Sequence, residues 1–399
     1  MKRRGDPLLT IVTASWPPQV SGSAILLSNL LSGYSGKVNV LFGYDEFAKS
    51  DPGFQPPCST VHLSTGSLIR IYPRLFSKVR RTFPEIATHI LQGSIYRALK
   101  RLGSDVVMAT FPYDIYLVAT YLAARRLAIP LYVHMHDLWM ENQPEGTAET
   151  RFAEQWEPII LKRATRVLCM TEAMQEHYQK KYNLPTALLP HSISEKDFLA
   201  APPRLCAPQP RPTVLFVGAV SDAMNLDALR VVAAASELLP KEYELLFCTH
   251  SDVATLKQHF GIVSSRLRTQ YVSRAEAQRF QAQAHVLIAP LSHNNCAVDE
   301  VRTVFSTKLL EYLVSGRPIV VFAPPDSYHA ESAQKNGWGH VVTKNSPEAL
   351  AEAIVKVATD QSLATELVAG ALQEAQRRRA EVHAKRLKEW VMMDAPNNG

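Results

Sequence analysis

Features of a secreted, membrane-spanning or zinc-binding protein are absent from this sequence. Its five cysteines, at 58, 169, 206, 248 and 296, contain no C-x-x-C pair, which argues against a zinc site and favours a reducing compartment. No run of about 18 apolar residues occurs, so we expect no transmembrane helix. The apolar run near the start is short and ends at Pro17-Pro18, which indicates a first β-strand and not a signal peptide. We therefore expect a cytoplasmic protein without a metal or other cofactor.

What is present is the composition of a globular chain. The 399 residues are 46% hydrophobic and 20% charged, which predicts a soluble protein of two or three domains. The net charge of +6 permits anionic partners without identifying them. Five prolines within residues 200–212 mark a domain boundary. The expected parts are an N-terminal domain over 1–200, a linker over 201–212, a second domain over 213–375, a C-terminal helix over 376–392 and a disordered tail over 393–399.

Short apolar runs alternate with helical patterns in both halves of the chain. Strand–helix alternation predicts parallel sheets with right-handed crossovers, and hence an α/β fold. The expected strands are Leu8–Ser15, Lys37–Phe42, Asp105–Thr110, Ile129–His134 and Thr165–Met170 in the first half, and Thr213–Val217, Tyr243–Cys248, Thr269–Val272 and Val286–Pro290 in the second.

The most informative stretch covers residues 305–320 and reads FSTKLLEYLVSGRPIV. Ser306 stands where a helix N-cap is expected, and leucines then recur at helical spacing. Gly316 ends the helix, and the apolar run Pro318–Phe322 has the pattern of a buried parallel strand. The stretch therefore predicts a helix, a tight turn and a strand.

The polar residues of this helix are concentrated at its start. A helix N-terminus offers free N–H groups and a partial positive charge, which suits phosphate. Lys308 adds a full positive charge in the first turn, which is unfavourable for the helix dipole unless an anion is bound there. Glu311 lies one turn further on, within reach of a sugar hydroxyl. The pattern indicates a phosphate site, and a surface helix with ordinary solvated charges is the alternative.

Other candidate site residues follow the ends of expected strands, where ligands of open α/β sheets bind. Ser21, Gly22 and Ser23 form a small-residue loop between a strand and a helix, which suits phosphate, although a plain tight turn is the alternative. His136 and Asp137 follow a second strand, and a purely structural pair is the alternative there. Gly218 follows a third strand and permits close backbone approach to a ligand.

Residues 68–103 carry eight basic residues against the single acid Glu85, interleaved with aromatic and aliphatic side chains. A basic amphipathic segment of this kind predicts an anionic membrane surface as a partner. The alternative is a helix pair whose basic side is merely solvated. No nucleic-acid-binding motif accompanies the charge, so no nucleic acid partner is expected.

The stretch F-S-x-K-L-L-E-Y-L-x-S-G-R-P-I-V resembles the donor-site segment of GT-B glycosyltransferases, especially retaining enzymes of the family 4 type. The early strand, Pro-Pro and Ser-Gly loop is similar to the start of such enzymes. The resemblance implies two Rossmann-like domains whose parallel sheets face each other across a cleft, with the last helix crossing back to the N-domain. It implies retaining, metal-independent sugar transfer from a nucleotide-diphosphate donor, with which the lack of a D-x-D motif agrees.

The resemblance also implies roles for individual residues. Ser306 and Lys308 would contact the donor diphosphate, and Glu311 the ribose. His136 would lie near the sugar or the leaving phosphate, with Asp137 orienting its ring. The loop of Ser21, Gly22 and Ser23 would lie near the donor phosphate and the acceptor, Gly218 would approach the donor, and Arg274 stands at the position that meets the nucleotide base.

Three positions depart from the family pattern. Thr303 stands where a first glutamate is common, and Ala219 and Met224 stand where an arginine and a lysine usually bind diphosphate. Arg274 and Arg302 are the candidates to replace those cations.

We therefore expect a glycosyltransferase that moves a sugar to a glycan or lipid-linked acceptor, in polysaccharide or glycoconjugate biosynthesis. The basic segment makes a peripheral position on the cytoplasmic membrane face an expectation too. The departures keep two alternatives open: a non-catalytic GT-B-like subunit that binds sugar nucleotides, and a sugar-nucleotide epimerase of the same fold.

Overall fold

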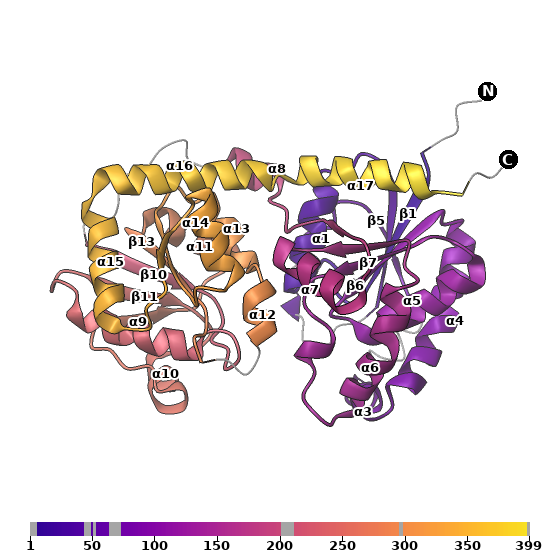
Figure 1. Ribbon diagram of the computed structural model, residues 1–399, viewed down its shortest axis with the longest axis horizontal. Helices are drawn as coiled ribbons and strands as arrows, with labels where there is room; N and C mark the ends of the chain where they lie inside the picture. Colours follow the sequence, from indigo (N-terminus) through magenta and orange to yellow (C-terminus); the bar gives the residue numbers. More distant parts are fainter. Residues whose placement is uncertain are drawn as a thin grey trace. The chain divides into compact units, whose positions relative to one another are not determined.

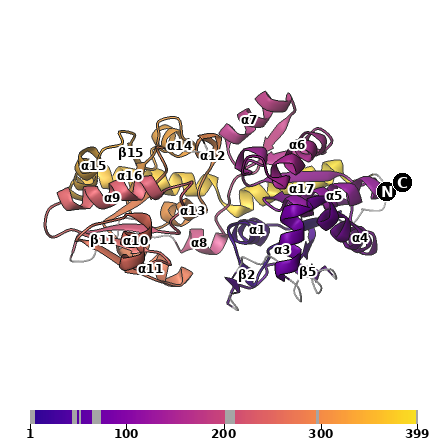
Figure 2. The ribbon, with the colours of Figure 1, turned by 90° about the horizontal axis from the view of Figure 1, so that it is seen from below.

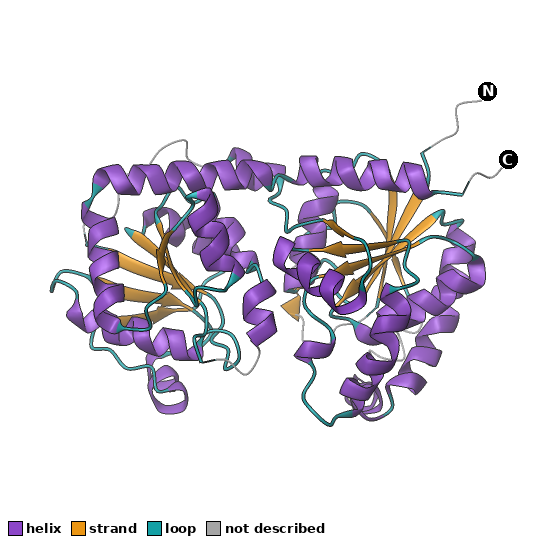
Figure 3. Ribbon diagram, viewed as in Figure 1, coloured by secondary structure: helices purple, strands orange, loops and turns teal. Residues whose placement is uncertain are grey.

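The computed structural model describes residues 6–43, 49–50, 53–63, 73–200, 211–294 and 298–396. The chain divides into two compact units, Met1–Glu195 with Ala380–Gly399 and Lys196–Arg379. Each unit is a parallel sheet with helices packed on it, which confirms the expected α/β fold of two Rossmann-like domains (Figures 1 and 3). Most of the expected linker, residues 201–210, lies outside the described residues.

The first unit is built on a seven-stranded sheet with the order β5-β3-β1-β6-β7-β8-β9. All of its neighbouring strands pair in parallel, for example Leu9 with both Val38 and Val106. Its strands are β1 Leu8–Thr13, β3 Lys37–Phe42, β5 Ser59–His62, β6 Val106–Phe111, β7 Leu131–Met135, β8 Arg166–Cys169 and β9 Thr186–Leu188. A separate antiparallel pair joins β2 Gln19–Val20 and β4 Lys49–Ser50.

The helices of this unit pack on both faces of the sheet. They are α1 Gly22–Ser32, α3 Pro73–Thr82, α4 Pro84–Leu102, α5 Asp114–Leu127, the 3-10 turn η1 Met140–Asn142, α6 Ala148–Leu161, α7 Glu172–Tyr182 and α17 Ala380–Asp394. Helices α4 and α5 lie side by side, as Figures 1 and 2 both show. Helix α17 packs against α1, and its Leu387 and Val391 are fully buried in the unit's core. It includes the first two residues of the segment 393–399; residues 397–399 lie outside the described part of the chain.

The second unit is built on a six-stranded parallel sheet with the order β12-β11-β10-β13-β14-β15. Its strands are β10 Thr213–Val217, β11 Glu244–Cys248, β12 Leu267–Gln270, β13 Val286–Pro290, β14 Ile319–Phe322 and β15 His340–Val342. Its helices are α9 Leu226–Leu238, α10 Val253–Phe260, α11 Arg274–Gln283, α12 Val298–Thr303, α13 Thr307–Leu313, α14 Tyr328–Asn336, α15 Pro347–Thr359 and α16 Gln361–Arg377. The short helix α8 Glu195–Leu199 spans the division between the units. Helices α9 and α15 lie side by side over one face of the sheet.

The direction of strand addition reverses once in each sheet. The reversal falls between β1 and β6 in the first unit and between β10 and β13 in the second. In open α/β sheets, ligands bind beyond the carboxyl ends of the strands at such a switch point. The two switch points therefore define where the functional residues of each unit are to be sought.

Candidate active site

A small cavity lies at the switch point of the second unit. Its walls come from the last residues of β10 and β13, from Ser306 and Lys308 at the start of α13, and from His329 on α14. Its volume of about 40 Å³ corresponds to roughly one water molecule. The Tyr312 hydroxyl accepts a hydrogen bond from the Val217 N–H at 2.9 Å and so fixes α13 against the end of β10. The helix start and the strand end that the sequence singled out are thus held together.

Lys308 and Gly218 are in direct contact in this site. Gly218 follows β10 with φ of +151°, a conformation that side chains strongly disfavour. A Cβ atom at this position would lie 2.6 Å from Lys308 Cε and closer still to Nζ. The lysine side chain therefore crosses the space that the missing side chain leaves open. Glycine at 218 is needed for this lysine as well as for the backbone conformation.

The Lys308 ammonium is held in an unfavourable environment. Burial lowers its pKa from 10.5 to about 8, and the nearby Glu311 carboxylate only partly opposes this. Its Nζ lies 5.7 Å from the centre of the Phe216 ring. Within the described residues, no carboxylate lies within ion-pair distance of Nζ. A buried cation without a partner costs folding free energy, so this lysine is suited to an anion that comes from outside the chain.

The N-terminus of α13 is fixed by a residue that the sequence analysis did not single out. Ser306 is the N-cap, as expected, but its hydroxyl makes no capping hydrogen bond. Its backbone N–H instead donates to Nε2 of His329 at 3.1 Å. Burial, and the positive charge of Arg378, lower the pKa of His329 to about 3, so this ring is neutral and accepts at Nε2. The Ser306 hydroxyl is therefore left for a ligand.

Glu311, three residues after Lys308 on α13, belongs to a charge network with α11 and α8. Its carboxylate accepts from Arg274 Nε at 2.9 Å and from Gln281 at 3.1 Å. Arg274 also pairs with Asp197 at 3.2 Å. Arg274 is thus already neutralised by two carboxylates and is not a free phosphate ligand in this arrangement. Each oxygen of the Glu311 carboxylate keeps a second lone pair, so a sugar hydroxyl can still donate to it.

The remaining departures from the family pattern have structural explanations. Arg302 is exposed and pairs with Asp326 at 2.7 Å. Thr303 is buried and donates to the Asp299 carbonyl within α12. In the loop after β10, Asn225 accepts from the Ser221 N–H at 2.9 Å and donates to the Ala219 carbonyl at 3.2 Å. The side-chain amide of Asn225 thus bridges the loop after β10, at the place where the family commonly has basic side chains.

The small-residue loop after β1 lies at the switch point of the first unit. Ser21 is the N-cap of α1 and accepts from the Ala24 N–H at 3.1 Å. The Ser21 hydroxyl also lies 3.3 Å from that of Tyr113, which follows β6. A Cβ atom at Gly22 would meet no atom of the described residues within 4 Å, so packing against them does not explain glycine there.

Ser23, His136 and His134 form a continuous hydrogen-bonded relay beside this loop. His136 Nδ1 lies 3.0 Å from the Ser23 hydroxyl, and its Nε2 lies 3.2 Å from His134 Nδ1. His134 Nε2 in turn lies 3.0 Å from the Leu189 carbonyl. All three side chains are buried. Sequence analysis predicted His136 and Ser23 separately and missed His134, although the H-x-H spacing in a strand places both rings on one face.

The relay fixes where its protons lie. Burial lowers the pKa of His134 to about 4, and burial and the neighbouring His134 and His191 hold that of His136 well below 6.5, so both rings are neutral. The Leu189 carbonyl can only accept, so His134 carries its proton on Nε2 and accepts at Nδ1. His136 therefore donates from Nε2 and accepts the Ser23 hydroxyl proton at Nδ1. Ser23 and His134 thus engage both nitrogens of the His136 ring, and the orienting role that the resemblance implies for Asp137 stays a prediction.

The segment that follows His136 is anchored by a buried ion network. Glu157 is fully buried and accepts from the Met140 N–H at 3.0 Å. Lys181 bridges Glu157 and Glu141, with both distances at 2.7 Å. His177 adds a contact of 2.9 Å to Glu141. Such a network positions the turn after β7 and with it the histidine relay.

The described residues hold neither a cluster of metal ligands nor a membrane-spanning helix. Across these residues, no group of three or more histidine, cysteine, aspartate or glutamate side chains is arranged to hold a metal ion. No helix in the described part of the chain is long and apolar enough to cross a membrane.

Comparison with known proteins identifies the class. Residues 43–189 match the family of the glycosyl transferase 4-like domain, and residues 211–360 match the glycosyl transferases group 1. Together the two matches cover about three quarters of the chain. With the two parallel sheets, they define this protein as a glycosyltransferase of the GT-B fold.

The structural relatives are distant in sequence. Sucrose-phosphate synthase from Thermosynechococcus elongatus has a TM-score of 0.70 at 17% identity, covering 97% of this chain and 98% of its own. Anabaena HepE in complex with UDP-glucose has a TM-score of 0.64 at 14% identity, and the match covers 97% of this chain and 99% of HepE. Trehalose 6-phosphate synthase from Burkholderia multivorans has a TM-score of 0.65 at 11% identity, and the match covers 98% of this chain and 97% of the synthase. These likenesses show the fold alone, and no curated protein matches the chain in sequence.

Proposed function

We propose that this chain transfers a sugar from a nucleotide-diphosphate donor, with a UDP-sugar as the first candidate, to a glycan or lipid-linked acceptor. The observation that carries the proposal is the buried Lys308 ammonium, which lies across Gly218 at the switch point without a carboxylate partner among the described residues. A donor diphosphate supplies the missing negative charge. The choice of UDP is supported by the relative HepE, which has been crystallised with UDP-glucose.

Different residues around Lys308 would contact different parts of the donor. Lys308, the Ser306 hydroxyl and the backbone N–H groups of Thr307 and Lys308 would hold the diphosphate. The next N–H of α13, that of Leu309, already donates to the Ser306 carbonyl at 3.0 Å. Glu311 would accept from the ribose while Arg274 keeps its carboxylate in place. The leaving diphosphate would be stabilised by these groups without a metal ion. In the first unit, we assign contact with the transferred sugar and the acceptor to His136 and the loop of Ser21, Gly22 and Ser23.

A thermal-shift screen against UDP, GDP, ADP, TDP and CMP tests the donor assignment. A ligand that binds only the folded state raises the melting temperature by mass action, by about 2.7 kcal/mol of stabilisation at a hundred times its Kd. We expect UDP to give the largest rise, and Lys308→Ala and Glu311→Ala to remove it. Lys344→Ala, which removes an exposed lysine of the same unit, is the matched control.

Turnover separates the enzyme from the alternative of a non-catalytic subunit. Release of UDP from a UDP-sugar in the presence of EDTA would establish a metal-independent enzyme, and the anomeric configuration of the product would establish retention. Nucleotide binding without any release of UDP would instead support the binding subunit. In that outcome, the lack of catalysis would be attributed to the loop after β10, where Asn225 forms a bridge and the family's basic side chains are missing.

We also propose that the first unit docks on an anionic membrane, where a lipid-linked acceptor would lie. Phe83, Ile86 and Ile90 occupy one side of the start of α4 and are 55%, 53% and 44% exposed. Exposed basic side chains lie on the same two helices, with Lys78 and Arg81 on α3 before the stripe and Arg97, Lys100 and Arg101 in the last turns of α4. An apolar stripe beside basic residues is the pattern of a membrane-surface helix. Residues 68–72 of the predicted segment lie outside the described residues.

Sedimentation with vesicles of equimolar phosphatidylglycerol and phosphatidylcholine tests this docking. We expect binding that weakens at high salt, and the combined change Phe83→Ser, Ile86→Ser and Ile90→Ser to weaken it by on the order of 100-fold, since each side chain loses about 1 kcal/mol of burial. Leu238→Ser, at an exposed leucine of the second unit, is the control. Unchanged binding of the triple variant would refute this surface.

A further inference from the structure

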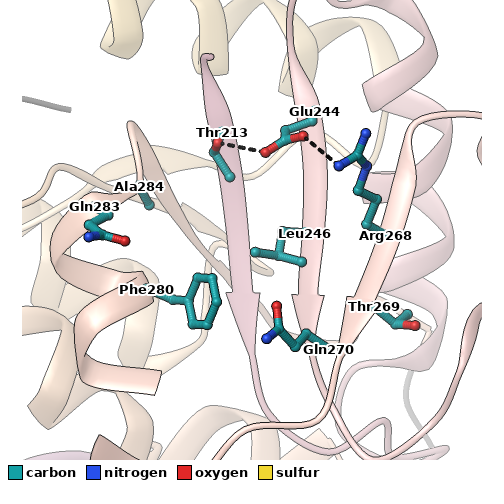
Figure 4. A pocket seen from close by; sticks show the side chains of 9 residues that line it. All are labelled: Thr213, Glu244, Leu246, Arg268, Thr269, Gln270, Phe280, Gln283 and Ala284. Carbon is teal, nitrogen blue, oxygen red and sulfur yellow. Dashed lines mark hydrogen bonds and ion pairs between the residues drawn. The ribbon is translucent and has the colours of Figure 1, made fainter. Parts of the chain in front are cut away.

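A groove of about 220 Å³ lies on the sheet of the second unit, away from the site described above. It begins at Thr213 and Glu244, the first residues of β10 and β11, and is walled by α11 on one side and β12 on the other (Figure 4). The Lys308 cavity lies at the opposite end of β10, beside Phe216 and Val217. The groove is therefore a separate feature of this unit.

The floor of the groove is apolar and incompletely covered. Leu245 and Phe247 point to the opposite face of β11 and are fully buried in the unit's core. Leu246, between them, is only half-buried, although β11 is an internal strand. The half-buried Phe280 ring of α11 points over Leu246 from the side (Figure 4). Parallel sheets are usually covered on both faces, so this exposed apolar surface is available to a ligand.

The rim of the groove is polar but carries no net charge. Glu244 accepts from the Thr213 hydroxyl at 3.2 Å and lies 3.7 Å from the Arg268 guanidinium, so the two charges compensate each other. Gln270 and Gln283 add two uncharged amide groups to the lining. The Glu244 carboxylate would repel an anionic ligand, and the Arg268 guanidinium would repel a cationic one. The rim therefore favours an uncharged ligand that bears many hydroxyl groups.

We propose that this groove binds one neutral pyranose ring of a glycan. A pyranose has an apolar C–H face for Phe280 and Leu246, and hydroxyl groups for the carboxylate, guanidinium and amides of the rim. The volume is below the roughly 300–1,000 Å³ of sites for drug-sized ligands, which suits a single ring. Sugar binding here is independent of the donor site. Its role, to hold a glycan acceptor or product by a second contact, rests on the proposed function.

Saturation-transfer NMR with methyl α-glucopyranoside, methyl α-mannopyranoside and methyl β-galactopyranoside tests the groove on the full chain. We expect transfer to the ring protons of at least one glycoside, with saturating UDP present so that the donor site is occupied. Phe280→Ala should reduce the signal at least threefold, and so should Glu244→Gln, which keeps the hydrogen bond to Thr213 but removes the charge. Val382→Ala, at an exposed valine of the other unit, should leave the signal unchanged.

The result is separable from that of the donor assignment. Lys308→Ala should lose the UDP thermal shift and keep the glycoside signal, and the two groove variants should keep the UDP thermal shift, which also shows that they are folded. The groove proposal is overturned if no glycoside receives saturation, or if Phe280→Ala and Glu244→Gln both give the signal of the unchanged protein.

Discussion

Replacing Lys308 by methionine is expected to weaken UDP binding by about 30-fold or more and, at the same time, to stabilise the second unit. Removing one partner from a buried charge pair costs about 2 kcal/mol or more of binding free energy. In the free protein the same ammonium destabilises the folded state, because its burial lowers the Lys308 pKa from 10.5 to about 8. Since tenfold in a protonation equilibrium equals about 1.4 kcal/mol, the charged form costs on the order of 3 kcal/mol.

Calorimetry and chemical denaturation measure the two effects separately. Methionine keeps most of the aliphatic stem, so the loss is of charge and not of packing. The exposed Lys344→Met, which makes the same chemical change, should alter neither quantity. Tight UDP binding in Lys308→Met would remove this lysine from the donor site, and a loss of stability would contradict the view that its charge is held without compensation.

The pH dependence of binding follows from the same lysine. The unfolded pKa is about 10.5 and the folded pKa about 8, so the destabilising contribution of Lys308 to the free protein diminishes as the pH increases from 8 toward 10.5. It is measured as the difference in stability between the unchanged protein and Lys308→Met. The bound diphosphate requires the protonated form, so the affinity should fall by up to tenfold for each pH unit above 8. This decline should be absent in Lys308→Met.

Periodicity in the sequence predicted the fold well because the inner strands of each sheet, such as β6 and β13, are buried on both faces. Apolar runs such as Lys37–Phe42, Thr213–Val217 and Val286–Pro290 have the observed bounds. The strands that were missed, β2, β4, β9 and β15, have only two or three residues each, which is too short for a pattern. The fold class is therefore a property that local composition determines.

The candidate site was only partly predictable, since its contacts join distant segments. Ser306, Lys308 and Gly218 were found because each has a local signal at a helix start or a strand end. His329 comes 23 residues after Ser306 and accepts its N–H, and no spacing rule connects the two. The pairing of Arg274 with both Glu311 and Asp197 was likewise invisible, which is why this arginine was taken for a free cation.

Replacing His136 by alanine is expected to lower the rate of UDP release from the best UDP-sugar by about 100-fold, while UDP affinity stays within threefold. The reason is positional: the relay from Ser23 to the Leu189 carbonyl holds the ring in one orientation and one tautomer. A displacement of about 1 Å in a group near the reacting atoms can lower the rate by about 100-fold. His134→Gln should give a smaller loss in the same parameter, because it disturbs the orientation of His136 without removing its ring.

The pH profile distinguishes positioning from general base catalysis. A conventional histidine base would lose activity below about pH 6.5 as it becomes protonated. His136 is neutral well below that value, so donor turnover should stay level between pH 6.5 and 5.5 in any range where the protein remains folded. Asp137→Asn should lie within threefold of the unchanged protein, since Ser23 and His134 hold the ring. A large effect of Asp137→Asn together with a fall in activity near pH 6.5 would replace the relay with a histidine–aspartate pair.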